Sequence, residues 1–275
     1  MTSSLSLARP RPAGQEPAIG GVERVGAGIS FAHPAPDRDV AAERLHRRRQ
    51  LAAALRLFAR YGVEPGLNGH ATARDPQVTD GLWINPIGVD FARIRASDLV
   101  LVNGKGEVLE GDLPINTGGL PLHLALQKAR PEIVGILHVH AFHGQAWSAF
   151  GRPVEPLIDD ISAFADDQVV YAPSTDPDLT PEQHRRRFTD AFTRNLLIYR
   201  NHGHWAIGRT VEAAAWRFIS FEIAARLQLT LLSTGQPYDL ARPNKQTEEQ
   251  REAFAALSFL PYWDRITGEE PELLD

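Results

Sequence analysis

Two apolar segments of this chain each end in histidines, and this pattern limits the folds that the chain can adopt. The first segment, 133–137, leads directly into His138 and, one residue further on, His140. Alternate residues of a β-strand point to the same face, so both imidazoles can hold one metal ion from one side. About 60 residues later a second apolar segment, 196–199, runs into the sequence Arg-Asn-His-Gly-His at 200–204. Two buried strands that both end in histidines indicate a metal site at the rim of a sheet, and therefore a metal enzyme.

His202 supplies the third imidazole that such a site needs, and Gly203 after it allows a close approach of the backbone. Together His138, His140 and His202 can bind one divalent ion, Fe²⁺, Mn²⁺ or Zn²⁺, and leave coordination positions for substrate or water. A His-x-His pair alone is also compatible with ordinary strand residues at a sheet edge, which are the more common case. The metal prediction therefore depends on the second strand.

Composition excludes several other kinds of protein. The 275 residues include no cysteine, which rules out disulfides, thiolate ligands and a catalytic cysteine. A net charge of -5 argues against a nucleic-acid partner. No run of 18 apolar residues is present, and the N-terminus lacks the apolar core of a secretory signal, so we expect no membrane partner and a cytoplasmic location.

The chain divides into three parts by composition. Residues 1–38 mix Ser, Arg, Gly and Pro, which predicts a flexible N-terminal arm; wrapping of a neighbouring subunit is an alternative. Residues 39–240 read as a single α/β domain. Residues 241–275 are a C-terminal extension that we expect to pack on the domain or on a neighbouring subunit.

Apolar periodicity and capping residues predict the main elements of the domain. The helix at 40–61 places Arg47, Arg48 and Arg49 on its solvent-exposed side, and Thr210 is the predicted N-cap of the last long helix. Helices are predicted at 40–61, 120–129, 178–195 and 210–232. Strands are predicted at 82–86, 97–102, 107–109 and 164–170, with a short one after the turn residues that open 66–76, besides the two that end in histidines.

Several further side chains are candidates for roles at the site. His123, His204 and Tyr171 are candidate catalytic proton donors; for His123, orientation of a ligand imidazole and a plain helical position are equally open. The candidates for binding a substrate carboxylate are His70, Thr72 and Arg74. Arg74 would do so by a bidentate pair, and a surface salt bridge is the alternative.

At these residues the chain resembles the class II aldolase/adducin family. The segments that carry the resemblance are 69–76 (GHATARDP), 83–88 (WINPIG), 96–100 (ASDLV), 138–140 (HVH) and 201–203 (NHG), in the family's order and spacing over roughly residues 40–235. The resemblance implies a three-layer α/β/α sandwich with a central, mostly antiparallel sheet. It also implies a homotetramer with sites between subunits, and it implies that the metal ligands are His138, His140 and His202.

The chain departs from the sugar-phosphate aldolases of this family at two motifs. Where those enzymes have the motif Ser-Ser-Glu, this chain has Thr117-Gly118-Gly119. Gly119 thus replaces the glutamate that serves in the family as acid/base and potential metal ligand. The family's Gly-Asn-x-Ser motif is here Gly-His-Ala-Thr at 69–72. Aldol cleavage of a sugar phosphate, or epimerisation, is therefore disfavoured.

An all-histidine site keeps the full charge of its metal, which favours a small anionic substrate that chelates through two oxygens. We therefore expect a metal-dependent enzyme that cleaves a C–C bond of an aromatic or 2-oxo/2-hydroxy acid, foremost by decarboxylation. The chain is similar to branches of the family that lack the glutamate, and these imply the same chemistry. One branch contains metal-dependent decarboxylases of aromatic acids. Another branch contains non-haem iron oxidative decarboxylases of aminocoumarin antibiotic pathways. The main alternative is therefore an Fe(II)- and O₂-dependent enzyme that acts on a hydroxyphenylpyruvate- or mandelate-type acid. A non-catalytic adducin-like scaffold is a further alternative.

Overall fold

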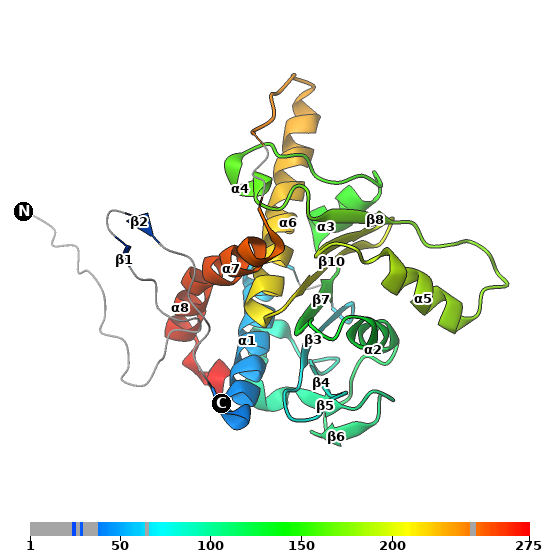
Figure 1. Ribbon diagram of the computed structural model, residues 1–275, viewed down its shortest axis with the longest axis vertical. Helices are drawn as coiled ribbons and strands as arrows, with labels where there is room; N and C mark the ends of the chain where they lie inside the picture. The colour runs from blue at the N-terminus through cyan, green and yellow to red at the C-terminus, as the bar shows by residue number, and fades with distance from the viewer. Residues whose placement is uncertain (1–23, 26–27, 30–37, 64–65, 243–245) are drawn as a thin grey trace, which may run out of the picture.

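The protein is built around one eight-stranded sheet, shown in the computed structural model of Figure 1. The structure describes residues 24–25, 28–29, 38–63, 66–242 and 246–275. Along the sheet the strand order is β6-β5-β4-β3-β7-β10-β9-β8, and every neighbouring pair is antiparallel except β8 with β9. The strands are β3 (Gly69–Arg74), β4 (Leu82–Ile84), β5 (Val100–Val102), β6 (Val108–Glu110), β7 (Gly135–Val139), β8 (Gln168–Tyr171), β9 (Leu196–Tyr199) and β10 (Gly203–Gly208).

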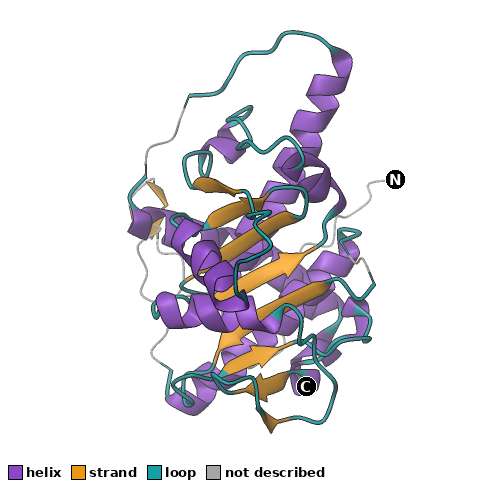
Figure 2. Cartoon of the chain, turned by 90° about the vertical axis from the view of Figure 1, so that its right-hand side faces the viewer, coloured by secondary structure: helices purple, strands orange, loops and turns teal. Residues whose placement is uncertain are grey.

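Helices cover both faces of the sheet, which confirms the predicted α/β/α sandwich. One face packs against α1, α3 and α6, with Phe58 and Phe218 in the shared core. The other face packs against α2 and α5 through residues such as Leu126 and Phe188. Figure 2 looks from the side of α2 and α5 and shows helices in front of the strands. The helices are α1 (Val40–Arg60), α2 (Leu120–Ala129), α3 (Phe142–Ser148), α4 (Asp159–Ser162), α5 (Pro181–Ala191), α6 (Val211–Thr234), α7 (Glu248–Ser258) and α8 (Leu260–Glu269), with 3₁₀ turns η1 (Phe91–Arg93), η2 (Ala96–Asp98) and η3 (Pro271–Leu274).

The C-terminal end of the chain lies outside the sandwich. The predicted arm, 1–38, falls almost wholly outside the described residues; within it the structure describes two short strands, β1 (Arg24–Val25) and β2 (Gly28–Ile29), and Arg38. The predicted extension, 241–275, forms α7, α8 and η3, which pack on α6 and α1 of the same chain. Among the described residues, no helix is long and apolar enough to cross a membrane.

Local signals placed the ends of α1, α2 and α6 within two residues. The helix predicted at 178–195 is shorter, at Pro181–Ala191, and the strand predicted at 164–170 begins only at Gln168. The Thr210 hydroxyl accepts from the Ala213 amide at 3.1 Å and starts α6 as predicted. The predicted strand at 97–102 starts only at Val100, because residues 96–98 form the 3₁₀ turn η2, where the Asp98 carboxylate accepts from the Arg95 amide.

The exposed role predicted for three arginines of α1 is wrong. Arg47, Arg48 and Arg49 are half-buried, and their guanidinium groups donate to the backbone carbonyls of Arg74, Ala96 and Leu274, respectively. They tie α1 to segments far away in the sequence, and spacing within one helix carries no information about such carbonyls.

Candidate metal centre

His138, His140 and His202 meet at one end of the sheet. Each offers one ring nitrogen, and the three nitrogens lie within 4.8 Å of one another. The Nε2 atom of His202 lies 3.1 Å from Nε2 of His138 and 3.3 Å from Nε2 of His140. Metal–nitrogen bonds of about 2.0–2.1 Å place neighbouring ligand nitrogens roughly 2.9 Å apart in octahedral and 3.3 Å apart in tetrahedral geometry. Both distances from His202 therefore fit a single divalent ion, and the His138–His140 pair lies within 4.8 Å.

The position of His138 follows from its place on β7, a central strand. Its Cα lies opposite His70 of β3 on one side and Trp205 of β10 on the other. Its Nδ1 lies 2.8 Å from the carbonyl oxygen of His204. Because a carbonyl only accepts, Nδ1 carries the hydrogen, and the lone pair of Nε2 is left to point at the other two imidazoles. The backbone thus selects the tautomer that a metal ligand needs.

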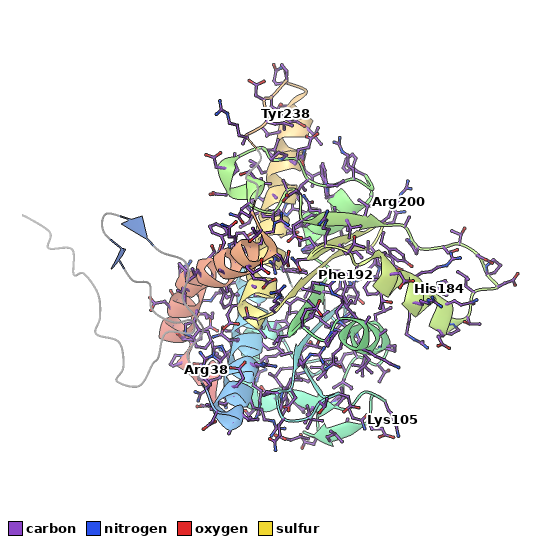
Figure 3. All side chains as sticks on the ribbon, viewed as in Figure 1. Arg38, Lys105, His184, Phe192, Arg200 and Tyr238 are labelled. Carbon is purple, nitrogen blue, oxygen red and sulfur yellow. The ribbon has the colours of Figure 1, made fainter. Side chains whose placement is uncertain are left out.

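His202 lies in the tight connection between β9 and β10. Asn201 adopts a left-handed conformation with φ 60°, which asparagine tolerates, and Gly203 has φ 145°, which favours glycine. The His202 amide donates to the Tyr199 carbonyl and to the Ser148 hydroxyl. Figure 3 labels Arg200 of this connection at the edge of the molecule. The turn aims one imidazole at the ends of the neighbouring strands.

His140 is held in place by the helix that comes directly after it in the chain. Helix α3 begins at Phe142, and the amides of His143 and Gly144 donate to the carboxylate of Glu222 on α6 at 2.9 and 2.7 Å. Nδ1 of His143 contacts the same carboxylate at 2.7 Å. This anchors the start of α3, two residues after His140, to the long helix behind the sheet.

A second chain of hydrogen bonds runs beside the three ligands. Thr72 Oγ1 lies 2.7 Å from Nδ1 of His123, and Nε2 of His123 lies 2.6 Å from Nδ1 of His70. The His70 ring centre is 5.0 Å from that of His138. The structure therefore brings His70 to the site, and His123, fully buried on α2, holds His70 in place instead of facing substrate. Thr72 is fully buried as well and contacts His123, not the triad, so the structure does not bring it to the substrate as predicted.

The imidazoles of this region are neutral at pH 7. Burial, with nearby His140 and His202, lowers the pKa of His70 to about 4, and burial lowers the pKa of His138 well below its ordinary value. The pKa values of His140 and His202 are lowered mainly by burial as well. Neutral imidazoles bind a metal ion without first losing a proton.

Two predicted roles disagree with the structure. His204 lies on the opposite face of the sheet, where its ring stacks on Phe218 of α6 at 4.1 Å, so it cannot donate a proton at the triad. Arg74 donates to the carbonyls of Gln127, Arg130 and Ile133. Its guanidinium is committed to carbonyls at the C-terminal end of α2 and in the turn that follows, so it is not free to bind substrate.

Tyr171 does not touch the triad directly. Its ring contacts Tyr199 at 5.1 Å, and the ring of Tyr199 contacts His202 at 4.9 Å. Burial raises the pKa of Tyr171. The sequence did not predict two neighbours of the ligands, Tyr199 and Trp205. The ring of Trp205 stacks on that of His138, with ring centres 4.4 Å apart. Each lies within three residues of His202, which was the available signal.

The sandwich and its three-histidine centre define a class of protein, and the comparison with known sequences identifies it. The chain belongs to the class II aldolase and adducin family: residues 49–229 match the family described as "Class II Aldolase and Adducin N-terminal domain".

Individual relatives show how the chain compares within the family. The "Meiotically up-regulated gene 14 protein" of Schizosaccharomyces pombe is 35% identical over 69% of this chain and 76% of its own length. "Decarboxylase NovR" of Streptomyces niveus is 34% identical over 69% and 71%. The "4-hydroxy-3-prenylphenylpyruvate oxygenase/4-hydroxy-3-prenylbenzoate synthase" of Streptomyces roseochromogenus subsp. oscitans is 32% identical over 74% and 75%. Among solved structures, the L-fuculose 1-phosphate aldolase of Glaciozyma antarctica PI12 superposes with a TM-score of 0.75 at 30% identity, over 87% of this chain and 97% of its own.

Proposed function

We propose that this protein is a divalent-metal-dependent enzyme that cleaves a carbon–carbon bond of an aromatic or 2-oxo/2-hydroxy acid by decarboxylation. The observation that carries the proposal is the ligand set, three neutral imidazoles with no carboxylate among them. Such a centre keeps the full +2 charge of its ion and favours an anionic substrate that binds through two oxygens. The similarity to a relative named as a decarboxylase supports the same reaction.

The residues around the triad suit this chemistry. A bound ion would act as a Lewis acid and stabilise the negative charge left on a substrate oxygen when the bond breaks. His70 offers a neutral hydrogen-bonding edge, the half-buried ring of Tyr199 lies beside His202, and the buried ring of Trp205 packs behind His138. An aromatic ring beside the ligands excludes water and matches an aromatic substrate.

The test compares two histidine substitutions. His140→Ala removes a ligand, whereas His184→Ala removes a histidine on α5, at the periphery of the molecule (Figure 3). We expect His140→Ala to lose both bound metal, measured by elemental analysis, and CO₂ release from a panel of aromatic and 2-oxo acids. His184→Ala should keep both. Retention of metal or of turnover by His140→Ala would remove the triad from the proposal.

A second candidate uses the same centre with Fe²⁺ and O₂ as an oxidative decarboxylase. The relative named as an oxygenase supports it, as do the positions that three protein ligands leave open. An anaerobic assay separates the two: product formed without O₂ excludes the oxygenase, and product that requires O₂ excludes simple decarboxylation.

We also propose that the protein assembles as a homotetramer with its centres near subunit contacts. Phe142 and Leu67 are 73% and 60% exposed. Both lie close to His140: Phe142 comes two residues after it, and the His140 amide donates to the carbonyl of Asn68, next to Leu67. Apolar side chains exposed in this way are typical of subunit contacts. Sedimentation velocity measures the assembly, and a monomer at micromolar concentration would contradict it.

A further inference from the structure

Gly119 immediately precedes α2, and its backbone does not explain why it is glycine. Its φ of -84° and ψ of -32° lie in the right-handed helical region, which every residue adopts readily. A glycine in such a conformation costs conformational entropy that an alanine would not. The reason for glycine must therefore lie in its surroundings.

Those surroundings are the ring of His70. A Cβ atom at position 119 would lie closer than 3.0 Å to three atoms of that ring, Nε2, Cδ2 and Cε1, and real Cβ atoms essentially never approach so closely. The His70 ring has little room to withdraw. Its Nδ1 edge is bonded to His123 at 2.6 Å, and Trp205 packs against it with ring centres 5.4 Å apart.

Position 119 and His70 thus compete for one space. His123, fully buried and bonded in turn to Thr72, holds the imidazole so that its free nitrogen, Nε2, faces the start of α2 beside the triad. The ring centre is 5.0 Å from that of His138, within reach of an acid bound at the three ligands. The polar group beside the triad at the start of α2 is thus the His70 imidazole of β3, and not a side chain at position 119.

We infer that His70 and Gly119 act as one specificity-determining position, in which the His70 imidazole fills the space of a side chain at 119 and presents Nε2 to an oxygen of the bound acid. The inference rests on the proposed function, because it takes an acid to bind at the triad. It assigns to His70 a direct substrate contact, and to His123 and Thr72 the role of positioning residues that orient the ring.

The first experiment tests the shared space by a double-mutant cycle in melting temperature. Gly119→Ala alone should lower Tm by about 5 °C, since overpacking of about 1–3 kcal/mol corresponds to shifts of this order. In a His70→Asn background the same change should leave Tm unchanged or raise it slightly. Gly118→Ala is the matched control, because its Cβ would meet only Asn116 Oδ1, at 3.4 Å. If Gly119→Ala alone does not fold and the double variant does, that rescue is the expected coupling. If Gly119→Ala lowers Tm equally in both backgrounds, the two side chains do not compete for the same space and the inference is wrong.

The second experiment tests the substrate contact by calorimetry, with 4-hydroxyphenylpyruvate as the probe and Zn²⁺-loaded protein. His70→Asn should keep its Zn²⁺ and bind the probe about tenfold more weakly, the loss expected for one hydrogen bond. The double variant should bind as weakly as His70→Asn, since folding is restored but the contact is not. Wild-type affinity in His70→Asn, or no binding by the wild type, would overturn the contact. Binding that depends on His70 without turnover of any acid would instead refute the proposed function and leave this inference standing.

Discussion

Glu222 is the residue through which helix α6 controls the geometry of the metal centre. Its buried carboxylate accepts from two amides at the start of α3 and contacts the His143 ring. Glu222→Ala would leave the buried Gly144 amide without an acceptor, at a cost of about 1–3 kcal/mol. It would also remove an anion from a helix N-terminus, worth about 0.3–1 kcal/mol. His143 is only half-buried, so water recovers part of its loss. We expect a total loss of about 2–4 kcal/mol, or roughly 10 °C in Tm.

The same change should weaken the metal centre. His140 precedes α3 by two residues, so loosening the start of this helix releases one ligand of three. Changes in residues that support metal ligands typically cost ten- to a hundredfold in affinity, and we expect a Zn²⁺ dissociation constant about tenfold higher. Glu222→Gln keeps the volume and one acceptor oxygen, and should lose about half as much stability.

The assay is urea unfolding of metal-free protein together with a competitive Zn²⁺ titration. Glu249→Ala is the matched control, because it removes an exposed glutamate from the first turn of α7. Equal midpoints for Glu222→Ala and Glu249→Ala would refute the capping argument. Lower stability with wild-type Zn²⁺ affinity would show that α3 does not position His140.

Three further outcomes are expected. Burial opposes ionisation of Asp75, but hydrogen bonds from Arg44 and from the Val78 amide hold the pKa of its carboxyl below the ordinary value. A carboxyl whose pKa is lower in the folded than in the unfolded state stabilises the protein at pH values above the unfolded-state pKa, and this stabilisation is lost as the pH falls. Asp75→Asn should therefore lower the free energy of unfolding in urea by about 2–3 kcal/mol at pH 7, and by progressively less below about pH 4. A loss that does not depend on pH would contradict this. Arg74→Ala should lower stability by about 2 kcal/mol through the lost carbonyl contacts and leave KM unchanged, and a raised KM at unchanged stability would restore its substrate role. Zn²⁺ at about 100 times its dissociation constant should raise the Tm of the wild type by about 5–10 °C and leave that of His140→Ala unchanged, as measured by scanning calorimetry.

The sequence predicted correctly the elements that depend on neighbouring residues, and missed those that depend on residues far away in the chain. Helix α2 and the start of α6 were predicted correctly because apolar spacing and the Thr210 cap are local signals. Helix α3 was missed because it has only seven residues, and its anchor, Glu222, lies about 80 residues further along the chain. No pattern within 142–148 announces a partner so distant.

The role predicted for His204 failed for a geometric reason. Residues two apart share a face only while both belong to the same regular strand. His202 precedes β10 and is turned by the left-handed Asn201 and by Gly203, whereas His204 obeys the alternation of the strand and faces α6. The alternation argument held for His138 and His140 although β7 ends at Val139, because the His140 amide still donates to the Asn68 carbonyl and extends the pairing by one residue.

The central position of β7 explains why the candidate site is specified by strand pairing. His138 lies opposite His70 and Trp205 by register, and the sheet continues beyond both partners, through β4 on one side and β9 on the other. A shift of one residue in either pairing would turn every side chain of the shifted strand to the other face and bury its polar groups among α1 and α6. The same register places the imidazole of His70 over Gly119. His138 and its neighbour His70 therefore depend on one set of backbone hydrogen bonds, whereas His202 depends on the turn before β10. Substitutions in the outer strands β6 and β8 should change stability without changing the spacing of the ligands.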